Sequence, residues 1–246
     1  MKHLNLNLIG GFGNRCMQYC AMRGFAEQHG FELRTTPWVG QKIFYLPEHP
    51  AADLTTPRRT ETQLLDNPEG DVSVEGYFQN QRAIDYWSKS KAVKWLRFSN
   101  ELFRRDSMMP GDTHYIACHL RRGDYLTNGA YPIISRESYE KFLRGCYLGA
   151  TPVHWISEET PRTANHLPLE FSFLPDFYCM IKAYWLLRAN STFSWFAHVL
   201  ADDSQRVFSP RIDGKPGGVE VDCDFEEGNH CRLSDHDFCS DLILKP

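Results

Sequence analysis

The pattern of hydrophobic and polar residues predicts strands that alternate with helices. Leucines alternate with asparagines over 4–8, which is the period of a β-strand, and a glycine-rich segment follows at 10–14. Beyond it, apolar residues from Met17 to Phe25 recur on one face of a helix that Gly30 ends. A strand, a glycine loop and a helix in this order form half of a βαβ unit.

The rest of the first half is less regular. Residues 72–78 predict a second strand, residues 80–106 are compatible with a helix, and residues 35–70 predict loops and short elements. A Pro-Gly-Asp break at 110–112 then interrupts the chain. We therefore expect two domains, of residues 1–109 and 110–246.

The second half predicts further strands and helices. The apolar run at 115–120 is typical of a buried strand, and residues 153–157 predict another. Ser135 is expected to cap a helix that runs to about residue 148. An apolar helix is expected over 177–188, and a second helix from Thr192 to Ala201. This alternation predicts an α/β protein.

Composition and charge restrict the classes of function. The chain has 246 residues, 42% of them hydrophobic, and a net charge of −4, which argues against a nucleic-acid partner but leaves room for a local basic pocket. The chain has no stretch of about 18 apolar residues, so we expect no integral membrane segment. The alternating N-terminus lacks the apolar core of a signal peptide. We expect a cytoplasmic protein whose eight scattered cysteines are thiols.

A charged cluster follows the strand expected at 115–120. Arg121 and Arg122 stand at its end, beside Gly123 and Asp124. Ligands of parallel α/β sheets bind beyond the carboxyl ends of strands, and guanidinium groups suit phosphate oxygens. The alternative is a surface arginine pair in a salt bridge with Asp124. The spacing alone leaves both interpretations open.

Two further segments could contact phosphate. The helix expected from Thr192 opens on Asn190 and Ser191, and its N–H groups could bind an anion, although plain N-capping is the commoner use of such residues. The glycine segment 10–14 lacks the glycine spacing of a dinucleotide-binding loop, which argues against a nicotinamide enzyme. Together with the arginines, these segments indicate a pocket for a nucleotide diphosphate.

Five segments between residues 10 and 195 carry recognisable motifs. They are Gly-Gly-Phe-Gly-Asn at 10–14 with Gln18 and Tyr19, Gly-Tyr-Phe-Gln at 76–79, His-Leu-Arg-Arg-Gly-Asp-Tyr at 119–125, Trp-Ile-Ser-Glu-Glu at 155–159 and Ala-Asn-Ser-Thr-Phe-Ser-Trp at 189–195. In this order they resemble the motifs of the α-1,2-fucosyltransferases of glycosyltransferase family 11. The resemblance implies a GT-B-like α/β fold, in which two Rossmann-like halves face an active-site cleft. The N-terminal half would be the acceptor side, and the C-terminal half would bind the GDP-sugar.

The resemblance also implies a reaction. Fucose would move from GDP-fucose to the 2-hydroxyl of a galactose-containing glycan, with inversion and without a metal or another cofactor. Because the departing GDP gains negative charge, fixed guanidinium groups would stabilise the transition state. The protein would be cytoplasmic, or peripheral at a membrane if the acceptor is lipid-linked.

The motifs and the resemblance together give a set of candidate site residues. The expected donor-binding residues are Gly11, Gly13, Asn14, His119, Arg121, Arg122, Asp176, Asn190, Ser191, Thr192 and Ser194. The expected catalytic residues are Arg121, Arg122, Asp124 and Glu75, and the acceptor side would carry Tyr77 and Gln79. The acids available as general base are Asp124, Glu75, Glu158 and Glu159, and the choice among them stays open.

Alternatives remain at the sequence level. Asp-Cys-Asp at 222–224 has the form of a GT-A metal motif, although it stands near the end of the chain. A zinc site could use Cys223, His230, Cys231, His236 and Cys239, without a Cys-x2-Cys pair. A non-catalytic GDP-sugar or glycan-binding protein, or a transferase for another GDP-sugar, also fits this fold. The segment between Arg121 and Ser191 is short for the family, and Arg15 and Cys16 stand where Gln and Met are usual.

Overall fold

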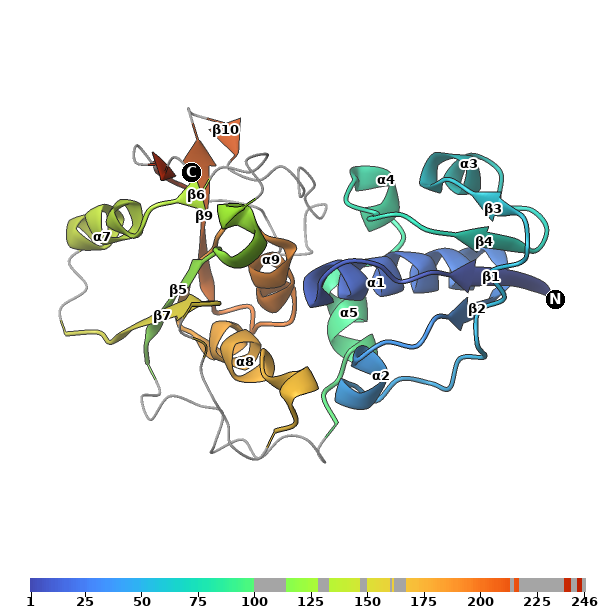
Figure 1. Cartoon of the computed structure of the whole chain (residues 1–246), viewed down its shortest axis with the longest axis horizontal. Helices are drawn as coiled ribbons and strands as arrows, with labels where there is room; N and C mark the ends of the chain where they lie inside the picture. The colour runs from blue at the N-terminus through green and yellow to red at the C-terminus, as the bar shows by residue number, and fades with distance from the viewer. Residues whose placement is uncertain are drawn as a thin grey trace. The chain divides into compact units, whose positions relative to one another are not determined.

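The chain folds into two compact units, one within residues 1–99 and the other from residue 114 onward (Figure 1). The computed structural model describes residues 1–99, 114–127, 133–146, 150–159, 161, 167–212, 215–216, 237–239 and 243–244. The domain boundary predicted at 109/110 lies outside these residues. The Asp-Cys-Asp segment at 222–224 and most of the possible zinc ligands also lie outside them.

The first unit is built on a parallel sheet. Its strands β1 (Lys2–Leu6), β2 (Phe31–Thr35), β3 (Arg58–Arg59) and β4 (Val72–Val74) lie in the order β2-β1-β4-β3. Its helices are α1 (Phe12–His29), α2 (Gly40–Ile43), α3 (Glu61–Asp66), α4 (Gln81–Ile84) and α5 (Lys89–Trp95). Strand β1, the glycine loop and α1 confirm the predicted half of a βαβ unit. Gly30 ends α1 in the left-handed conformation, at φ +71°.

The helical character compatible with residues 80–106 is present only in two short helices over the described part up to residue 99. Each of them, α4 and α5, begins at its own N-cap. The Asn80 side chain accepts a hydrogen bond from the Ala83 N–H, and the Ser88 side chain accepts one from the Lys91 N–H. Such caps favour new helix starts over a continuous helix.

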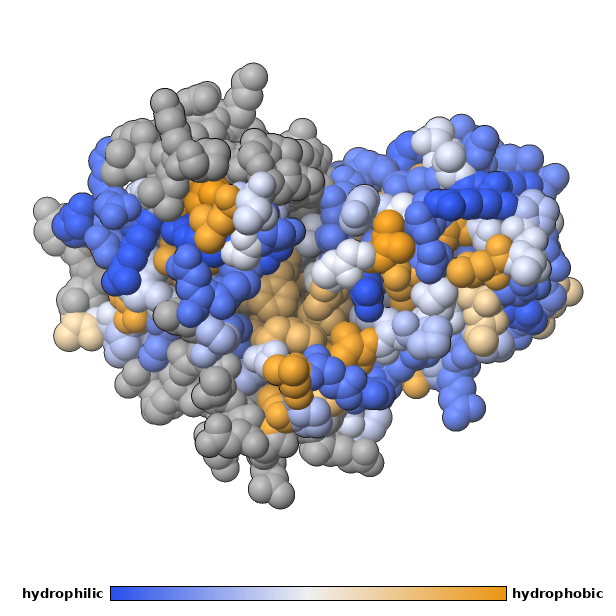
Figure 2. Space-filling view, in the orientation of Figure 1, coloured by the Kyte–Doolittle hydropathy of each residue, from blue (hydrophilic) through white to orange (hydrophobic). Residues whose placement is uncertain are grey.

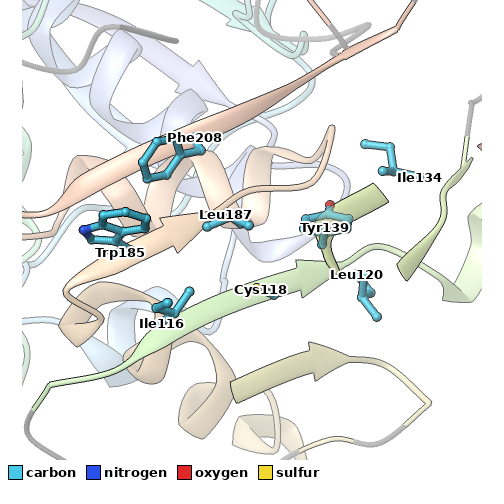
Figure 3. Close-up of a cluster of buried hydrophobic side chains, with 8 residues drawn as sticks. All are labelled: Ile116, Cys118, Leu120, Ile134, Tyr139, Trp185, Leu187 and Phe208. Carbon is cyan, nitrogen blue, oxygen red and sulfur yellow. The ribbon is translucent and has the colours of Figure 1, made fainter. Parts of the chain in front are cut away.

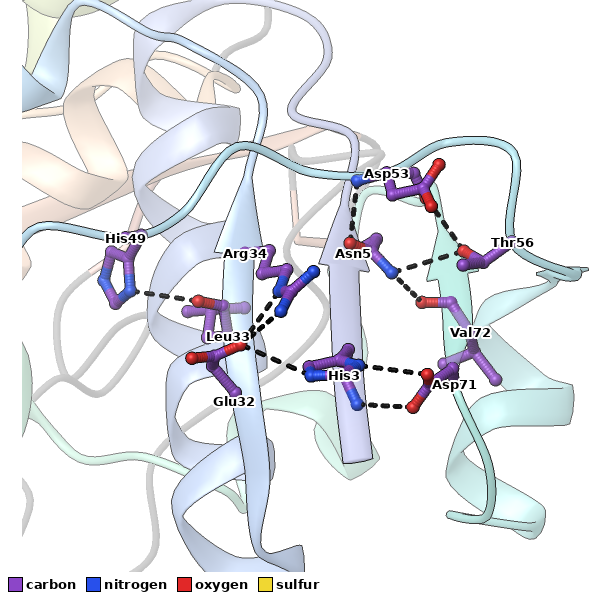
Figure 4. A network of polar contacts seen from close by, with 10 residues as sticks. All are labelled: His3, Asn5, Glu32, Leu33, Arg34, His49, Asp53, Thr56, Asp71 and Val72. Carbon is purple, nitrogen blue, oxygen red and sulfur yellow. Dashed lines mark hydrogen bonds and ion pairs between the residues drawn. The ribbon is translucent and has the colours of Figure 1, made fainter. Parts of the chain in front are cut away.

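Polar contacts join the strands of the first sheet (Figure 4). The His3 N–H donates to Asp71 Oδ1 over 2.9 Å, and His3 Nε2 lies 3.5 Å from Glu32 Oε2. Asn5 Nδ2 donates to the carbonyl of Val72 over 3.2 Å. These contacts tie β1 to the segments on both sides of it. Because β1 and β4 pair in parallel, the residues that follow them stand at one edge of the sheet.

The second unit is built on a larger sheet. Strands β5 (Ile116–Leu120), β7 (Val153–Ser157), β8 (Trp185–Leu187) and β9 (Arg206–Ile212) lie in the order β9-β8-β5-β7 and pair in parallel. Strands β10 (Lys215–Pro216) and β11 (Asp237–Cys239) pair with β9, and β6 (Ile133–Ile134) pairs with β12 (Ile243–Leu244). The helices are η1 (Gly123–Leu126), α7 (Arg136–Gly145), η2 (Leu169–Phe171), α8 (Leu174–Lys182) and α9 (Thr192–Val199).

Helices cover both faces of the second sheet. One face packs against α7 through a buried cluster of Ile116, Cys118, Leu120, Ile134, Tyr139, Trp185, Leu187 and Phe208 (Figure 3). On the other face, the Tyr115 hydroxyl donates to the Cys179 carbonyl of α8 over 2.8 Å, and the His119 ring lies near Phe193 of α9. A parallel sheet between helix layers is a Rossmann-like arrangement.

Several predicted elements of this unit are confirmed, and one is wrong. Ser135 caps α7, residues 153–157 form β7, and α9 starts at Thr192. The helix expected over 177–188 instead ends at Lys182, and Trp185–Leu187 form β8. A strand buried on both faces is a continuous apolar run, so the pattern alone cannot distinguish it from a buried helix.

The described surface and thiols agree with the composition. Hydrophilic residues dominate the outer surface of the first unit in the view of Figure 2, with hydrophobic residues in patches among them. The described cysteines Cys16, Cys20, Cys118, Cys146 and Cys179 are free thiols. Across the described ranges, none of the helices has the length and apolar character that a membrane crossing requires.

A close approach between α1 and the chain at Tyr86 depends on Gly24. A Cβ at Gly24 would lie 2.1 Å from the Tyr86 carbonyl oxygen. We expect Gly24→Ala to lower the free energy of unfolding by about 1–3 kcal/mol through overpacking, although alanine favours helices. Gly145→Ala is the matched control, because no described atom outside its chain neighbours and its own helix backbone lies within 4 Å of its added Cβ. Urea unfolding should separate the two variants, and equal stabilities would contradict the assigned contact.

Candidate active site

Three charged residues follow three neighbouring parallel strands of the second unit. Arg121 follows β5, Glu158 follows β7 and Arg188 follows β8. The pairing of Leu120 with Ser157 brings the ends of β5 and β7 to one edge. Ligands of parallel α/β sheets bind at this edge. The second unit therefore carries a charged candidate site where the arginine motif predicts one.

Of these three residues, Arg188 is absent from the sequence-based set. Glu158 enters there only as one of four possible bases, and Arg188 is missed because its segment was expected to be helical. Arg188 is 5% exposed. The signal that could have found it is an apolar run that ends in arginine, which residues 185–188 share with residues 115–121.

Arg121 is held by two carboxylates. Its Nη1 donates to Glu158 Oε1 and its Nη2 to Asp124 Oδ1. Its guanidinium carbon lies 4.9 Å from the centre of the Tyr125 ring. Its Nε is buried and has no hydrogen-bond acceptor in the described part of the chain. The salt bridge with Asp124 that the sequence left open is present, and one buried donor of the same guanidinium is unsatisfied.

Arg122 is buried and bonds to the backbone. Its Nη1 donates to the carbonyls of Arg121 and Ile134, each over 3.0 Å, and its N–H donates to Glu158 Oε2 over 3.0 Å. Gly123 follows with φ +51°, which glycine adopts readily. These contacts support the turn that presents Arg121. A direct role of Arg122 in donor binding or catalysis stays a prediction.

His119 stands two positions before Arg121, on the face of β5 that α9 covers. It is 2% exposed, and its Nδ1 has no hydrogen-bond partner among the residues that the structure describes. Burial lowers the pKa of His119 to about 4; Glu158 opposes this shift, and the nearby arginines, including Arg188, add to it. His119 is therefore neutral near pH 7 and keeps a polar atom available to a ligand.

The start of α9 makes its own local contacts. Ser191 is the N-cap, and its Oγ accepts from the Phe193 N–H over 3.3 Å. The buried Ser194 Oγ donates towards the Ser191 carbonyl over 3.3 Å. The Asn190 carbonyl accepts from the Tyr125 hydroxyl over 3.0 Å. Ser191 therefore caps α9, as the alternative interpretation expects. Phosphate contacts at this helix start stay a prediction.

The remaining donor residues predicted in this unit lie on the same helix layer. Asp176 is in the first turn of α8 and is buried, at 6% exposure. Thr192 is the first residue of α9 and is partly exposed. Both helices cover the sheet face that carries His119. A role of either side chain in donor binding stays a prediction.

In the first unit, the glycine loop meets the segment that follows β4. Gln79 Nε2 donates to Asn14 Oδ1 over 2.9 Å. Gly10 has φ +74°, and a Cβ there would lie 2.8 Å from Asn14 Nδ2 and 3.2 Å from Tyr77 Cε1. The structure thus brings the predicted donor residue Asn14 together with the predicted acceptor-side residues Tyr77 and Gln79.

The helix that follows the glycine loop also fixes its start. Gly11 is the N-cap of α1 and has no side-chain cap, and Gly13 is buried in the first turn. Gln18 is fully buried. Its side-chain oxygen accepts from the Ile9 N–H over 2.9 Å, and its Nε2 donates to the Ile9 carbonyl over 3.0 Å. Gln18 of the first motif therefore holds the backbone at Ile9, just before the glycine loop.

A second feature exposes Tyr77. Phe78 has φ +53° and is fully buried, and its N–H donates to Glu61 Oε2 over 3.0 Å. Tyr77 beside it is 50% exposed. Glu75 accepts from Asn7 Nδ2 and, over 2.7 Å, from Arg58 Nη2. A positive φ at a bulky residue costs energy and is often kept at functional sites.

Metal ligands are not gathered within the described residues. No group there of three or more His, Cys, Asp or Glu side chains could hold a metal ion. Of the possible zinc ligands, only Cys239 is in the described part, as backbone in β11. Independence from a metal stays a prediction.

Comparisons with known proteins give the fold. Neither a protein-family model nor a curated protein sequence matches the chain. A structure of NodZ α-1,6-fucosyltransferase soaked with GDP-fucose matches with a TM-score of 0.52 and 12% identity, over 82% of this chain and 93% of that chain. A NodZ structure co-crystallised with GDP has a TM-score of 0.51 and 13% identity, over the same shares. The selenomethionine form of the Bradyrhizobium fucosyltransferase NodZ has a TM-score of 0.53 and 13% identity, over 88% of this chain and 97% of that chain.

These matches confirm the predicted fold class. The chain has an α/β, GT-B-like fold of two Rossmann-like halves, as the fucosyltransferase structures do. Two of these matched structures are named for an α-1,6 linkage, whereas the sequence motifs resemble enzymes that form an α-1,2 linkage.

Proposed function

We propose that the protein is a fucosyltransferase that moves fucose from GDP-fucose to a hydroxyl of a glycan. The observation that carries the proposal is the pair of buried, unsatisfied polar atoms, Arg121 Nε and His119 Nδ1, at the carboxyl end of β5. They belong to a fold that the chain shares with fucosyltransferase structures. Guanidinium groups at such a strand end suit the phosphates of a nucleotide-sugar.

The proposed donor site lies in the second unit. Arg121 and His119 would contact the diphosphate, and Arg122 would hold the turn between them and η1. The start of α9 would add N–H donors. The other donor residues proposed in this unit are Asp176, Asn190, Ser191, Thr192 and Ser194. Gly11, Gly13 and Asn14 of the first unit are proposed as donor residues on the resemblance of the first motif.

The proposed reaction is a displacement with inversion. The acceptor oxygen would attack the anomeric carbon while the bond from that carbon to the β-phosphate oxygen breaks. Arg121 would stabilise the charge that GDP gains, without a metal. We propose Glu75 as the base for the acceptor proton, because it lies two residues before the exposed Tyr77 of the proposed acceptor side. Tyr77 and Gln79 would lie on the acceptor side.

The linkage is a finer proposal. The five motifs favour transfer to the 2-hydroxyl of a galactoside, and the α-1,6 name of the matched structures provides a second candidate. GDP release from GDP-fucose and from GDP-mannose should be measured with a galactoside and with an N-acetylglucosamine oligosaccharide, in excess EDTA. NMR of the product then gives the linkage.

Each outcome separates one alternative. An α-1,2 product supports the full proposal, and an α-1,6 product keeps fucosyl transfer but overturns the linkage. Faster GDP release from GDP-mannose than from GDP-fucose would overturn fucose as the transferred sugar. Binding of GDP-fucose without release of GDP under any acceptor would show a binding protein and overturn the enzyme. Loss of activity in EDTA would overturn the metal-independent mechanism.

Tyr77 provides a test of the acceptor side. Because a half-exposed ring can stack on the apolar face of a sugar, we expect Tyr77→Ala to raise the KM for the acceptor about ten-fold. The KM for GDP-fucose should stay within about two-fold. Tyr77→Phe, which keeps the ring, is the matched control. A change in the KM for GDP-fucose alone would contradict the acceptor role of Tyr77 and indicate a role in donor binding.

A further inference from the structure

We propose that the two carboxylates on Arg121 have opposite roles. Glu158 positions the guanidinium, whereas Asp124 occupies the place of an anionic oxygen and leaves Arg121 when a diphosphate binds. The inference rests on the proposed function in one respect, which is that Arg121 binds the diphosphate of the donor.

Asp124 has the features of a contact that is easily displaced. Its side chain is 67% exposed, and its ion pair with Arg121 Nη2 is the only one that its carboxylate makes in the described part of the chain. It belongs to the first turn of η1, three residues after Arg121. Exposed ion pairs of this kind contribute little, so a diphosphate with more negative charge can replace the carboxylate.

Glu158 is held more firmly. Its side chain is 36% exposed, and both of its oxygens are used. One accepts from Arg121 Nη1 and the other from the Arg122 N–H over 3.0 Å, which links the end of β7 to the end of β5. Partial burial works against its charge, but Arg121 and these hydrogen bonds lower the pKa of Glu158 below its ordinary value. Glu158 therefore stays ionised and anchored.

The geometry of the guanidinium separates the two roles. Nε and Nη2 form one edge of the planar group, which presents two parallel N–H donors, and Nη1 lies on the other side. Glu158 holds Nη1, so it leaves this edge open. Asp124 uses only Nη2, while Nε is buried without an acceptor in the described residues. Once Asp124 leaves, the Nε–Nη2 edge can bind two phosphate oxygens.

Matched amide variants test the inference. Binding of GDP and of inorganic pyrophosphate to the full-length protein is measured by calorimetry for the wild type, Asp124→Asn and Glu158→Gln. We expect Asp124→Asn to bind both probes roughly two- to five-fold more tightly, because the competing charge is gone. Glu158→Gln should bind them about ten-fold more weakly or worse, because its NH2 group would face one of the two donors that Glu158 accepts from, Arg121 Nη1 or the Arg122 N–H.

The signs of the two changes decide the outcome. If both variants bind more tightly, the carboxylates act only through their charge, and the inference is overturned. If Asp124→Asn binds no more tightly than the wild type, its role as a placeholder is wrong. If Glu158→Gln does not fold, Glu158→Asp replaces it, since the shorter side chain keeps the charge but loses the reach, and it should also weaken binding.

The same measurements separate this inference from the proposed function. A wild-type protein that binds neither GDP nor pyrophosphate would overturn both. Opposite shifts in the two variants without sugar transfer would support the inference and overturn the fucosyltransferase. Transfer of fucose by a protein whose two variants change in affinity in the same direction would support the fucosyltransferase and overturn the inference.

Discussion

Arg121→Ala should lower the rate of GDP release from GDP-fucose at least about 100-fold. The side chain carries the charge that would face the departing diphosphate, and removal of one preformed donor to a developing anion costs about this much in other enzymes. Because the interaction strengthens as the bond breaks, the loss should fall on kcat more than on the KM of the acceptor. Steady-state kinetics with both substrates varied would measure the division.

Two control variants support this test. Arg121→Lys keeps a charge but loses the planar fork, so its rate should lie between those of the wild type and the alanine variant. Arg82→Ala removes an exposed arginine of the first unit that pairs with Asp66, and it should leave the rate unchanged. Near-normal turnover of Arg121→Ala would refute the role of Arg121.

His119→Gln should reduce the loss of stability in mild acid. In the unfolded chain the pKa of histidine is about 6.5, whereas burial lowers the pKa of His119 in the folded protein to about 4. Between these values the unfolded chain binds a proton that the folded chain does not. The free energy of unfolding therefore falls as the pH falls from about 6.5 to about 4, by up to about 3 kcal/mol from this group.

The stability that the neutral His119 contributes is complete above about pH 6.5. The informative quantity is therefore the slope of the free energy of unfolding against pH below this value. Urea unfolding of the wild type and of His119→Gln should be measured from about pH 7.5 down to about pH 4, so that the range between the two pKa values is covered. Other acidic and histidine side chains act in both proteins, so the difference between the two curves isolates His119. Parallel curves would show that the ring is protonated in the folded protein as readily as in the unfolded chain.

The sequence was sufficient for elements with a clear period and a clear end. β1 and α1 were predictable because leucines alternate before a glycine loop and Gly30 ends the helix. Arg121 was predictable because a buried strand ends in a charged residue. Arg188 was not, because three apolar residues in a short central strand have the same pattern as a helix turn.

Contacts between distant segments were outside the reach of any local pattern. No local pattern at Phe78 predicts its positive φ, and its N–H bonds to Glu61, 17 residues away. The sequence also treats Arg121 and Arg122 alike, whereas packing directs one to carboxylates and the other to backbone carbonyls. The motifs gave the residue types of the site, and the division of tasks among them came from the tertiary structure.

The side-chain amide of Gln18 offers Ile9 the same donor and acceptor that a neighbouring strand would offer. The chain just beyond β1 is therefore completed by a helix side chain and not by the sheet. One result is that the glycine loop takes its position from α1: a rotation or shift of this helix would carry the loop with it, while the strands stayed in place. The position of the backbone at Ile9, just before the glycine loop, thus depends on the position of α1.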